Sequence, residues 1–137
     1  MIEALRAALL AIALLLAPAA SAAAQPNAAS ATLTAPLGWL VGRWEGTGTR
    51  MGSATTARLD VSPALGGRFV EFSYVSSGFE GRAFYRQVAP GRWRGEWFDI
   101  RGVHFGIDAT VEPRALNSDW GSTETERGRT VYRLLVS

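Results

Sequence analysis

The sequence predicts an all-β protein: an antiparallel meander of about eight short strands, closed or nearly closed into a small barrel and preceded by a short helical turn. Two observations lead to this prediction. Apolar and polar residues alternate with a period of two over most of residues 42–136, and Gly, Pro and Ser separate the alternating segments. No segment in this range has the spacing of an amphipathic helix. Closure would remove the exposed edges of such a large sheet.

Residues 1–24 are typical of a secretory signal peptide. Arg6 precedes an apolar run at residues 7–17, and Ala22-Ala23-Ala24 offers a cleavage site of small residues. The apolar run is too short to span a bilayer. We therefore expect a periplasmic or secreted protein with no integral membrane association after cleavage.

The remainder divides into a flexible linker rich in Ala, Ser and Asn at residues 25–33 and one barrel domain at residues 34–137. The chain has no cysteine, which excludes disulfides and thiolate metal sites. A single histidine cannot assemble a metal site, so we expect no metal and no cofactor. The net charge is only +2, and the arginines are interspersed with acidic residues, which argues against a nucleic-acid partner.

The segment before the first strand predicts the helical turn. Thr34 suits the N-cap position, and Pro36 suits the first turn because its missing N–H costs nothing there. A turn ending near Leu40 would lay Leu37 and Leu40 across one end of the barrel.

The first predicted strand begins at Gly42 and has one face with almost no side chains. Gly42, Trp44, Gly46 and Gly48 share this face, and Arg43, Glu45, Thr47 and Thr49 share the other. Glycine in a strand interior suits a place where the backbone bends or where bulky side chains approach closely. The following strands are expected at residues 54–61, 68–75, 79–88, 92–99, 103–111, 115–126 (with a break at Gly121) and 130–136.

The loop after Asp99 decides which face His104 occupies. A two-residue loop would place Asp99 and His104 on one face as an acid–imidazole pair. A three-residue loop with Gly102 in the left-handed conformation instead separates apolar from polar residues cleanly, because a one-residue slip inverts the two faces. We favour the three-residue loop, which turns His104 outward to solvent.

The inward parity of the strands defines the candidate ligand-binding residues. They are Trp44, Phe72, Tyr74, Tyr85, Trp93, Trp97, Asp99, Phe105, Trp120 and Tyr132. Inward glycines at positions 42, 46, 81 and 95 leave room beside these rings. An eight-stranded barrel either fills such an interior with side chains or holds one small ligand, and both interpretations remain open. Buried tyrosine hydroxyls and a carboxylate need polar partners, which favours the ligand.

Leu37, Leu40, Gly42, Trp44, Gly46 and Gly48 form the pattern L-x-x-L-x-G-x-W-x-G-x-G. This pattern resembles the opening of lipocalin-like (calycin) barrels, most closely small secreted bacterial domains of unknown function and more distantly the nitrobindin-like haem-binding barrels. The resemblance implies a lipocalin-like β-barrel. Beyond the first strand, it rests only on the rhythm of the strands.

The resemblance has two further implications. In calycins an Arg near the last strand packs on the Trp of the first strand, so Arg133 or Arg129 would close the barrel over Trp44. Such barrels also tend to continue with another hairpin. The barrel is therefore expected to lack C-terminal strands, to be closed by the N-terminal segment, or to be completed by a second subunit.

We therefore predict an exported protein that binds a small, largely apolar or aromatic molecule without transforming it. The second hypothesis is a solid-core interaction module that forms a homodimer through the strand edge at residues 130–136. A haem-binding barrel with His104 as ligand is less favoured, as is a hydrolase or isomerase in which burial raises the pKa of Asp99. An enzyme is the less favoured class, because the sequence shows no nucleophilic triad and no catalytic residue can be assigned.

Overall fold

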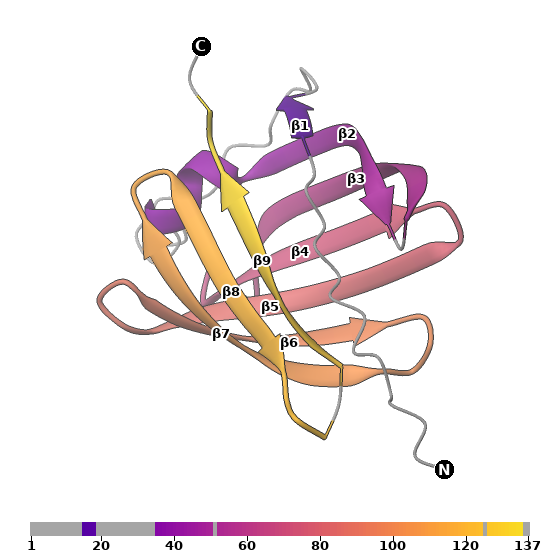
Figure 1. Ribbon diagram of the computed structural model, residues 1–137. Helices are drawn as coiled ribbons and strands as arrows, with labels where there is room; N and C mark the ends of the chain where they lie inside the picture. The colour runs from indigo at the N-terminus through magenta and orange to yellow at the C-terminus, as the bar shows by residue number, and fades with distance from the viewer. Residues whose placement is uncertain (1–14, 19–34, 51, 125, 136–137) are drawn as a thin grey trace.

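The computed structural model describes residues 15–18, 35–50, 52–124 and 126–135. Its strands follow one another in a single antiparallel sheet in chain order and curl strongly into a half-barrel (Figure 1). The elements are β1 (Leu15–Pro18), the 3-10 helix η1 (Ala35–Leu40), β2 (Gly42–Arg50), β3 (Ser53–Ala64), β4 (Phe69–Ser76), β5 (Phe79–Ala89), β6 (Arg92–Asp99), β7 (His104–Glu112), β8 (Ala115–Gly121) and β9 (Arg127–Arg133).

The predicted fold class is confirmed: strands β2 to β9 form an eight-stranded antiparallel meander behind a short helical turn. Each strand pairs with its neighbours in sequence, and no pairing joins β9 to β2 within the described part of the chain. The described sheet is therefore a strongly curled half-barrel. One strand was not expected. The short β1 lies within the predicted leader and pairs with β2 from Leu15 opposite Thr47 to Pro18 opposite Trp44.

Most strand boundaries agree with the prediction within one residue, and β9 ends at Arg133 instead of residue 136. Two further differences are explained by backbone conformation. β3 continues through Pro63 to Ala64, because the reversal is made by Leu65 (φ 52°) and the two glycines that follow it. β8 ends at Gly121 (φ 81°), and β9 begins at Arg127, three residues before its predicted start. A left-handed residue cannot continue an extended strand, so these positions set the turns.

The meander places successive hairpins at opposite ends of the half-barrel. One end, which we call the mouth, carries the loops at residues 77–78 and 100–102 and the described loop residues 122–124 and 126. The opposite end carries the loops at residues 65–68, 90–91 and 113–114 and is covered by η1, which contacts β7. The sheet therefore has one capped end and one end bordered by hairpins alone.

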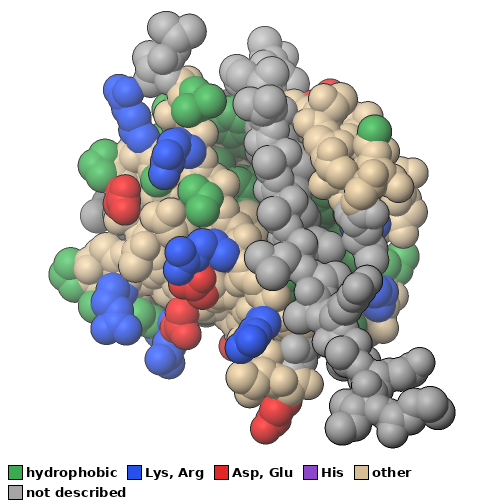
Figure 2. All heavy atoms as spheres, in the orientation of Figure 1, with side chains coloured by type: hydrophobic (Ala, Val, Ile, Leu, Met, Phe, Trp, Pro, Cys, Tyr) green, Lys and Arg blue, Asp and Glu red, His purple; other side chains and the backbone are tan. Residues whose placement is uncertain are grey.

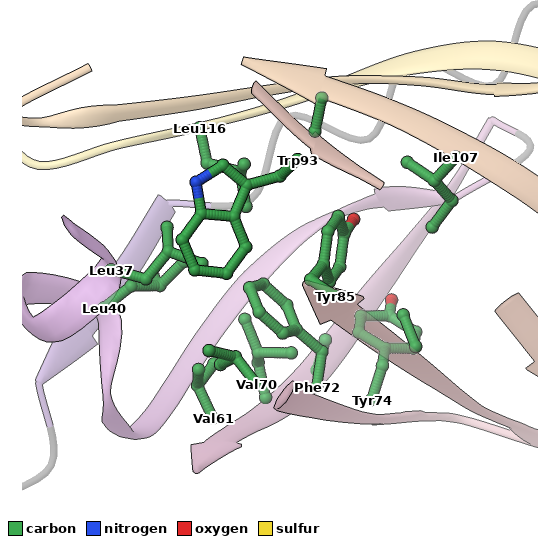
Figure 3. Packing of buried hydrophobic residues seen from close by; sticks show 14 residues of the cluster. Leu37, Leu40, Val61, Val70, Phe72, Tyr74, Tyr85, Trp93, Ile107 and Leu116 are labelled. Atoms are coloured by element: carbon green, nitrogen blue, oxygen red, sulfur yellow. The ribbon is translucent and has the colours of Figure 1, made fainter. Parts of the chain in front are cut away.

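One part of the core lies at the capped end. Leu37 and Leu40 of η1 are only 0% and 3% exposed, as the amphipathic turn predicted. Figure 3 shows both side chains beside the indole of Trp93, with Val61 and Val70 on the adjoining strands. Burial of leucine side chains of this size stabilises a fold by about 1.5–3 kcal/mol each, so η1 contributes substantially to closing this end.

Several charged side chains of the convex face form ion pairs. Arg43 and Arg58 both contact Asp60, at 2.7 and 3.1 Å, across neighbouring positions of β2 and β3. Arg129 contacts Asp119 at 2.7 Å on β8 and β9. In the view of Figure 2, basic and acidic side chains lie next to one another and form no continuous basic stripe.

The predicted signal peptide and linker lie outside the described residues, except for the four residues of β1. Thr34, the predicted N-cap, also lies outside them. Among the described residues, no helix has the length and hydropathy required to cross a membrane.

Candidate binding site on the concave face

All ten candidate residues lie on strands with the inward parity that the sequence indicated. Phe72, Tyr74, Tyr85 and Trp93 are buried, with 2%, 7%, 3% and 2% of their surface exposed. The remaining candidates are partly buried: Trp44, Trp97, Asp99, Phe105, Trp120 and Tyr132. The concave face therefore combines buried rings with rings that stay partly accessible.

The loop between β6 and β7 has the register that segregates apolar from polar residues. Trp97 lies opposite Phe105, and Gly102 has φ 75°, so the loop has three residues. Asp99 and His104 consequently lie on opposite faces. His104 is exposed on the convex face, where its Nε2 lies 2.6 Å from Glu96 Oε2 and its ring stacks on Phe98. A haem ligand inside the barrel is not available from this position.

Asp99 is fully engaged by donors at the mouth. Its Oδ1 accepts hydrogen bonds from the Arg101 backbone N–H (2.9 Å) and Nε (3.1 Å). Its Oδ2 accepts from Arg101 Nη2 (2.7 Å) and from Trp97 Nε1 (3.0 Å). The side chain is 0% exposed.

The pKa of Asp99 shows that it is not poised for acid–base chemistry. Burial acts to raise this pKa, but the hydrogen bonds from Arg101 and Trp97 outweigh burial and lower the pKa to about 2. The expectation that burial would raise it is therefore wrong. A carboxylate that stays ionised with every oxygen bonded is a positioning group for Trp97 and the 100–102 loop.

An aromatic strip crosses the concave face near the mouth; it consists of Phe79, Trp97, Phe105 and Trp120. Phe79 and Trp97 stack at 6.2 Å between ring centroids with a 12° angle between planes, and Trp97 and Phe105 at 6.3 Å and 15°. Phe105 and Trp120 continue the strip at 5.1 Å and 21°. The strip thus joins four consecutive strands through nearly parallel rings, all partly accessible.

Two of the inward glycines, Gly81 and Gly95, accommodate rings, whereas a Cβ on Gly42 would meet nothing within 4 Å. A Cβ placed on Gly81 would overlap the Trp97 indole, and one on Gly95 would lie 3.0 Å from the Tyr85 ring. A Cβ on Gly128, a residue that the sequence did not single out, would lie 2.5 Å from the Trp120 indole. Large rings therefore lie over glycines of the adjacent strands, and this arrangement fixes the aromatic strip against the sheet.

Two arginines border the strip at its Phe79 end. The Arg50 guanidinium carbon lies 4.2 Å from the Phe79 ring centroid, and that of Arg101 lies 5.5 Å from it. Arg101 also contacts Glu126 at 2.7 Å and Asp99 at 2.7 Å, which together raise its pKa. Its positive charge is therefore matched by two carboxylates.

Deeper in the half-barrel, three tyrosines come together. Burial raises the pKa of Tyr85 to about 12, against the lowering effect of its hydrogen bond with Ser118. The two hydroxyls lie 3.2 Å apart. Burial, followed by the influence of the Tyr85 and Tyr74 phenols, raises the pKa of Tyr132 as well. The phenols of Tyr85 and Tyr132 therefore stay protonated at neutral pH and act as hydrogen-bonding groups.

Two buried hydroxyls on β4 lack partners. Tyr74 Oη and Ser76 Oγ have no hydrogen-bond partner among the described residues. Both residues are buried, with only 7% and 6% of their surface exposed. Figure 3 shows the Tyr74 and Tyr85 hydroxyls pointing away from the strands that carry them. A buried hydroxyl without a hydrogen bond costs about 1–3 kcal/mol, so both groups favour an incoming polar atom.

The contact expected between Trp44 and Arg133 is not seen in the described structure. Trp44 instead donates its indole N–H to the Leu40 carbonyl oxygen at 2.7 Å, which ties β2 to η1. Arg133 is exposed on β9 opposite Ala115, and Arg129 is paired with Asp119. The guanidinium–ring contacts found among the described residues both involve Phe79.

Sequence reasoning missed four residues of this site. Phe79 is the first residue of β5, and Arg50 is the last residue of β2. The alternating pattern gives the weakest indication of parity at the ends of a strand. Ser76 and Ser118 share the inward parity but are small and polar, so only the structure shows that they are buried. Within the described residues, no cluster of three or more His, Cys, Asp or Glu side chains is arranged to hold a metal ion.

Comparisons with protein-family models, with curated protein sequences and with solved structures find no significant match to this chain. The eight-stranded antiparallel half-barrel is consistent with a lipocalin-like fold.

Proposed function

We propose that this protein binds one small, largely apolar or aromatic molecule on its concave face and does not transform it. The observation that carries the proposal is the pair of buried, unpaired hydroxyls of Tyr74 and Ser76 beside a partly accessible aromatic strip. Apolar surface with a few polar groups directed inward is the usual composition of a small-molecule site.

The proposal gives each part of the concave face a role. The rings of the aromatic strip supply apolar contact area, with Trp97 held in place by Gly81 beneath it and Asp99 beside it. The hydroxyls of Tyr74 and Ser76 orient the ligand. The closed end formed by η1, Trp93 and Leu116 belongs to the packed core.

The proposal also includes the finer classification and the location. The L-x-x-L-x-G-x-W-x-G-x-G segment and the curled meander support a lipocalin-like barrel of the calycin type. The leader-like residues 1–24 support export to the periplasm or beyond. The small net charge of +2 and the ion pairs among the exposed arginines favour neither a nucleic acid nor a membrane as partner.

Binding is tested with N-phenyl-1-naphthylamine, a neutral aromatic probe whose fluorescence rises in apolar sites, and with native mass spectrometry of the purified protein for co-purifying molecules. We expect a saturable rise in fluorescence with one probe per chain. Tyr74→Phe and Ser76→Ala should weaken the binding of any co-purified ligand. Ser73→Ala, on the convex side of β4, should leave that binding unchanged. The absence of saturable binding together with an empty mass spectrum would refute the proposal.

A second function is favoured by the free edge of the sheet. β9 pairs with β8 on one side, and no described strand pairs with its other side. Unpaired backbone groups at such an edge support dimerisation by strand addition. Analytical ultracentrifugation tests this: a dimer that a proline at Val131 converts to a monomer supports it, and a monomeric wild-type chain contradicts it.

A further inference from the structure

Arg50 differs from every other described arginine. It lies at the end of β2 on the inward parity and is partly buried, whereas the remaining arginines in the described ranges are exposed. Its guanidinium carbon sits 4.2 Å from the Phe79 ring centroid. Arg50 therefore reaches the concave face at the point where the aromatic strip begins.

Arg50 also has no carboxylate partner among the described residues. Its neighbour at the mouth, Arg101, is paired with both Asp99 and Glu126. The ion pairs of Arg43, Arg58, Arg82, Arg94 and Arg129 are all on the convex face. A guanidinium that is partly removed from water beside an aromatic ring attracts an anion, since the ring alone does not neutralise its charge.

The geometry limits the kind of anion. One planar guanidinium matches one carboxylate through two parallel hydrogen bonds. A doubly charged phosphate would require a second free cation, and Arg101 is already neutralised by two acidic side chains. The group next to the carboxylate would then lie against Phe79 and Trp97, which accept a flat apolar ring.

We propose that the ligand of the concave face is a small aromatic carboxylic acid, whose carboxylate pairs with Arg50 while its ring packs on the aromatic strip. This inference rests on the proposed binding function and adds its chemical class. It makes Arg50 the specificity-determining residue and the aromatic strip the part that supplies general affinity.

The test compares 2-naphthoate with its neutral isostere 2-naphthamide by isothermal titration calorimetry on the purified chain. We expect the wild type to bind the carboxylate about tenfold more tightly than the amide, the usual scale for one charge-assisted pair at a partly exposed site. Arg50→Gln should abolish this preference, because naphthoate should then bind no more tightly than the amide. Raising the salt concentration should weaken naphthoate binding only.

Three further measurements distinguish the outcomes. Arg86→Gln, an exposed arginine on the convex side of β5, should retain the tenfold preference. Arg50→Lys, which keeps the charge, should retain part of it even if Arg50→Gln is poorly folded. Equal binding of both naphthalenes by the wild type, or an undiminished preference in Arg50→Gln, would overturn this inference and leave the binding function standing. Failure of both naphthalenes and of N-phenyl-1-naphthylamine to bind would overturn both.

Discussion

The indole of Trp97 on β6 lies directly over Gly81 on β5 and occupies the space that any side chain at position 81 would need. The two residues are on adjacent strands, with Trp97 paired to Ala83 and Gly81 paired to Asp99. Trp97 is also held from its other side by the bond from its Nε1 to Asp99. This relationship sets the position of the whole aromatic strip.

Gly81→Ala should therefore destabilise the protein by about 1–3 kcal/mol, because an overpacked ring must shift or change rotamer. Urea unfolding followed by circular dichroism measures the change. Gly106→Ala on β7 is the matched control, since a Cβ there meets nothing within 4 Å. The control should be neutral or slightly stabilising; equal losses in the two variants would contradict the packing of Trp97 on Gly81.

Asp99 should make the stability depend on pH at the acidic end. Its pKa of about 2 lies below the value of about 3.9 for an unfolded Asp, so the ionised form stabilises the folded state. This stabilisation is fully present above about pH 4 and is lost as the pH falls through about 2.

Thermal unfolding between pH 2 and 7 measures this dependence, and Asp99→Asn should flatten it. Arg129 also lowers the pKa of Asp119, so Asp119 adds to the pH dependence of stability in both the wild type and Asp99→Asn. Some dependence on pH should therefore remain in the variant. Asp99→Asn should also cost about 2 kcal/mol at neutral pH, through weakened bonds to Arg101 and Trp97. An unchanged pH profile would mean that Asp99 is not ion-paired in solution.

The two tyrosines should respond oppositely to removal of their hydroxyls. Tyr85→Phe loses the 3.2 Å hydrogen bond with Ser118 and should destabilise the protein by about 1 kcal/mol. Tyr74→Phe removes a buried hydroxyl without a partner in the described structure and should be neutral or stabilising. Denaturant midpoints of the ligand-free proteins test this, and a clear loss in Tyr74→Phe would indicate a partner for that hydroxyl.

Trp44 should be more important for η1 than for ligand binding. Its indole N–H bonds to the Leu40 carbonyl at 2.7 Å, so Trp44→Phe removes one link between β2 and η1. We expect a loss of about 1 kcal/mol in unfolding free energy and little change in probe binding. A strong loss of N-phenyl-1-naphthylamine binding with unchanged stability would place Trp44 in the ligand site instead.

The strand order, the inward parity and the η1 turn could be predicted because each follows from local alternation and turn residues. The three-residue loop at Gly102 was predictable for the same reason, since only that register keeps Trp97 and Phe105 on one face. Local pattern does not reveal how far a sheet curls or what covers a glycine. Gly81 and Gly95 were therefore interpreted as room for a ligand, although rings from neighbouring strands lie over them.

The charge state of Asp99 was outside the reach of the sequence for a different reason. Its parity showed that it points inward, which suggests desolvation and a raised pKa. The turn that follows brings the Arg101 backbone and guanidinium back onto the same carboxylate, and that geometry depends on the loop conformation. The same limitation concealed Arg50, whose proximity to Phe79 depends on the curvature of the sheet.

The strictly sequential order of the strands has a kinetic consequence. Every pairing from β2 to β9 joins strands that are consecutive in the chain, so each of these can form by closing a short hairpin. Proteins with such low contact order fold faster than those whose first and last strands must meet. The meander from β2 to β9 should therefore refold hairpin by hairpin without a final search for a distant partner strand, and the rate of the main phase in stopped-flow refolding tests this.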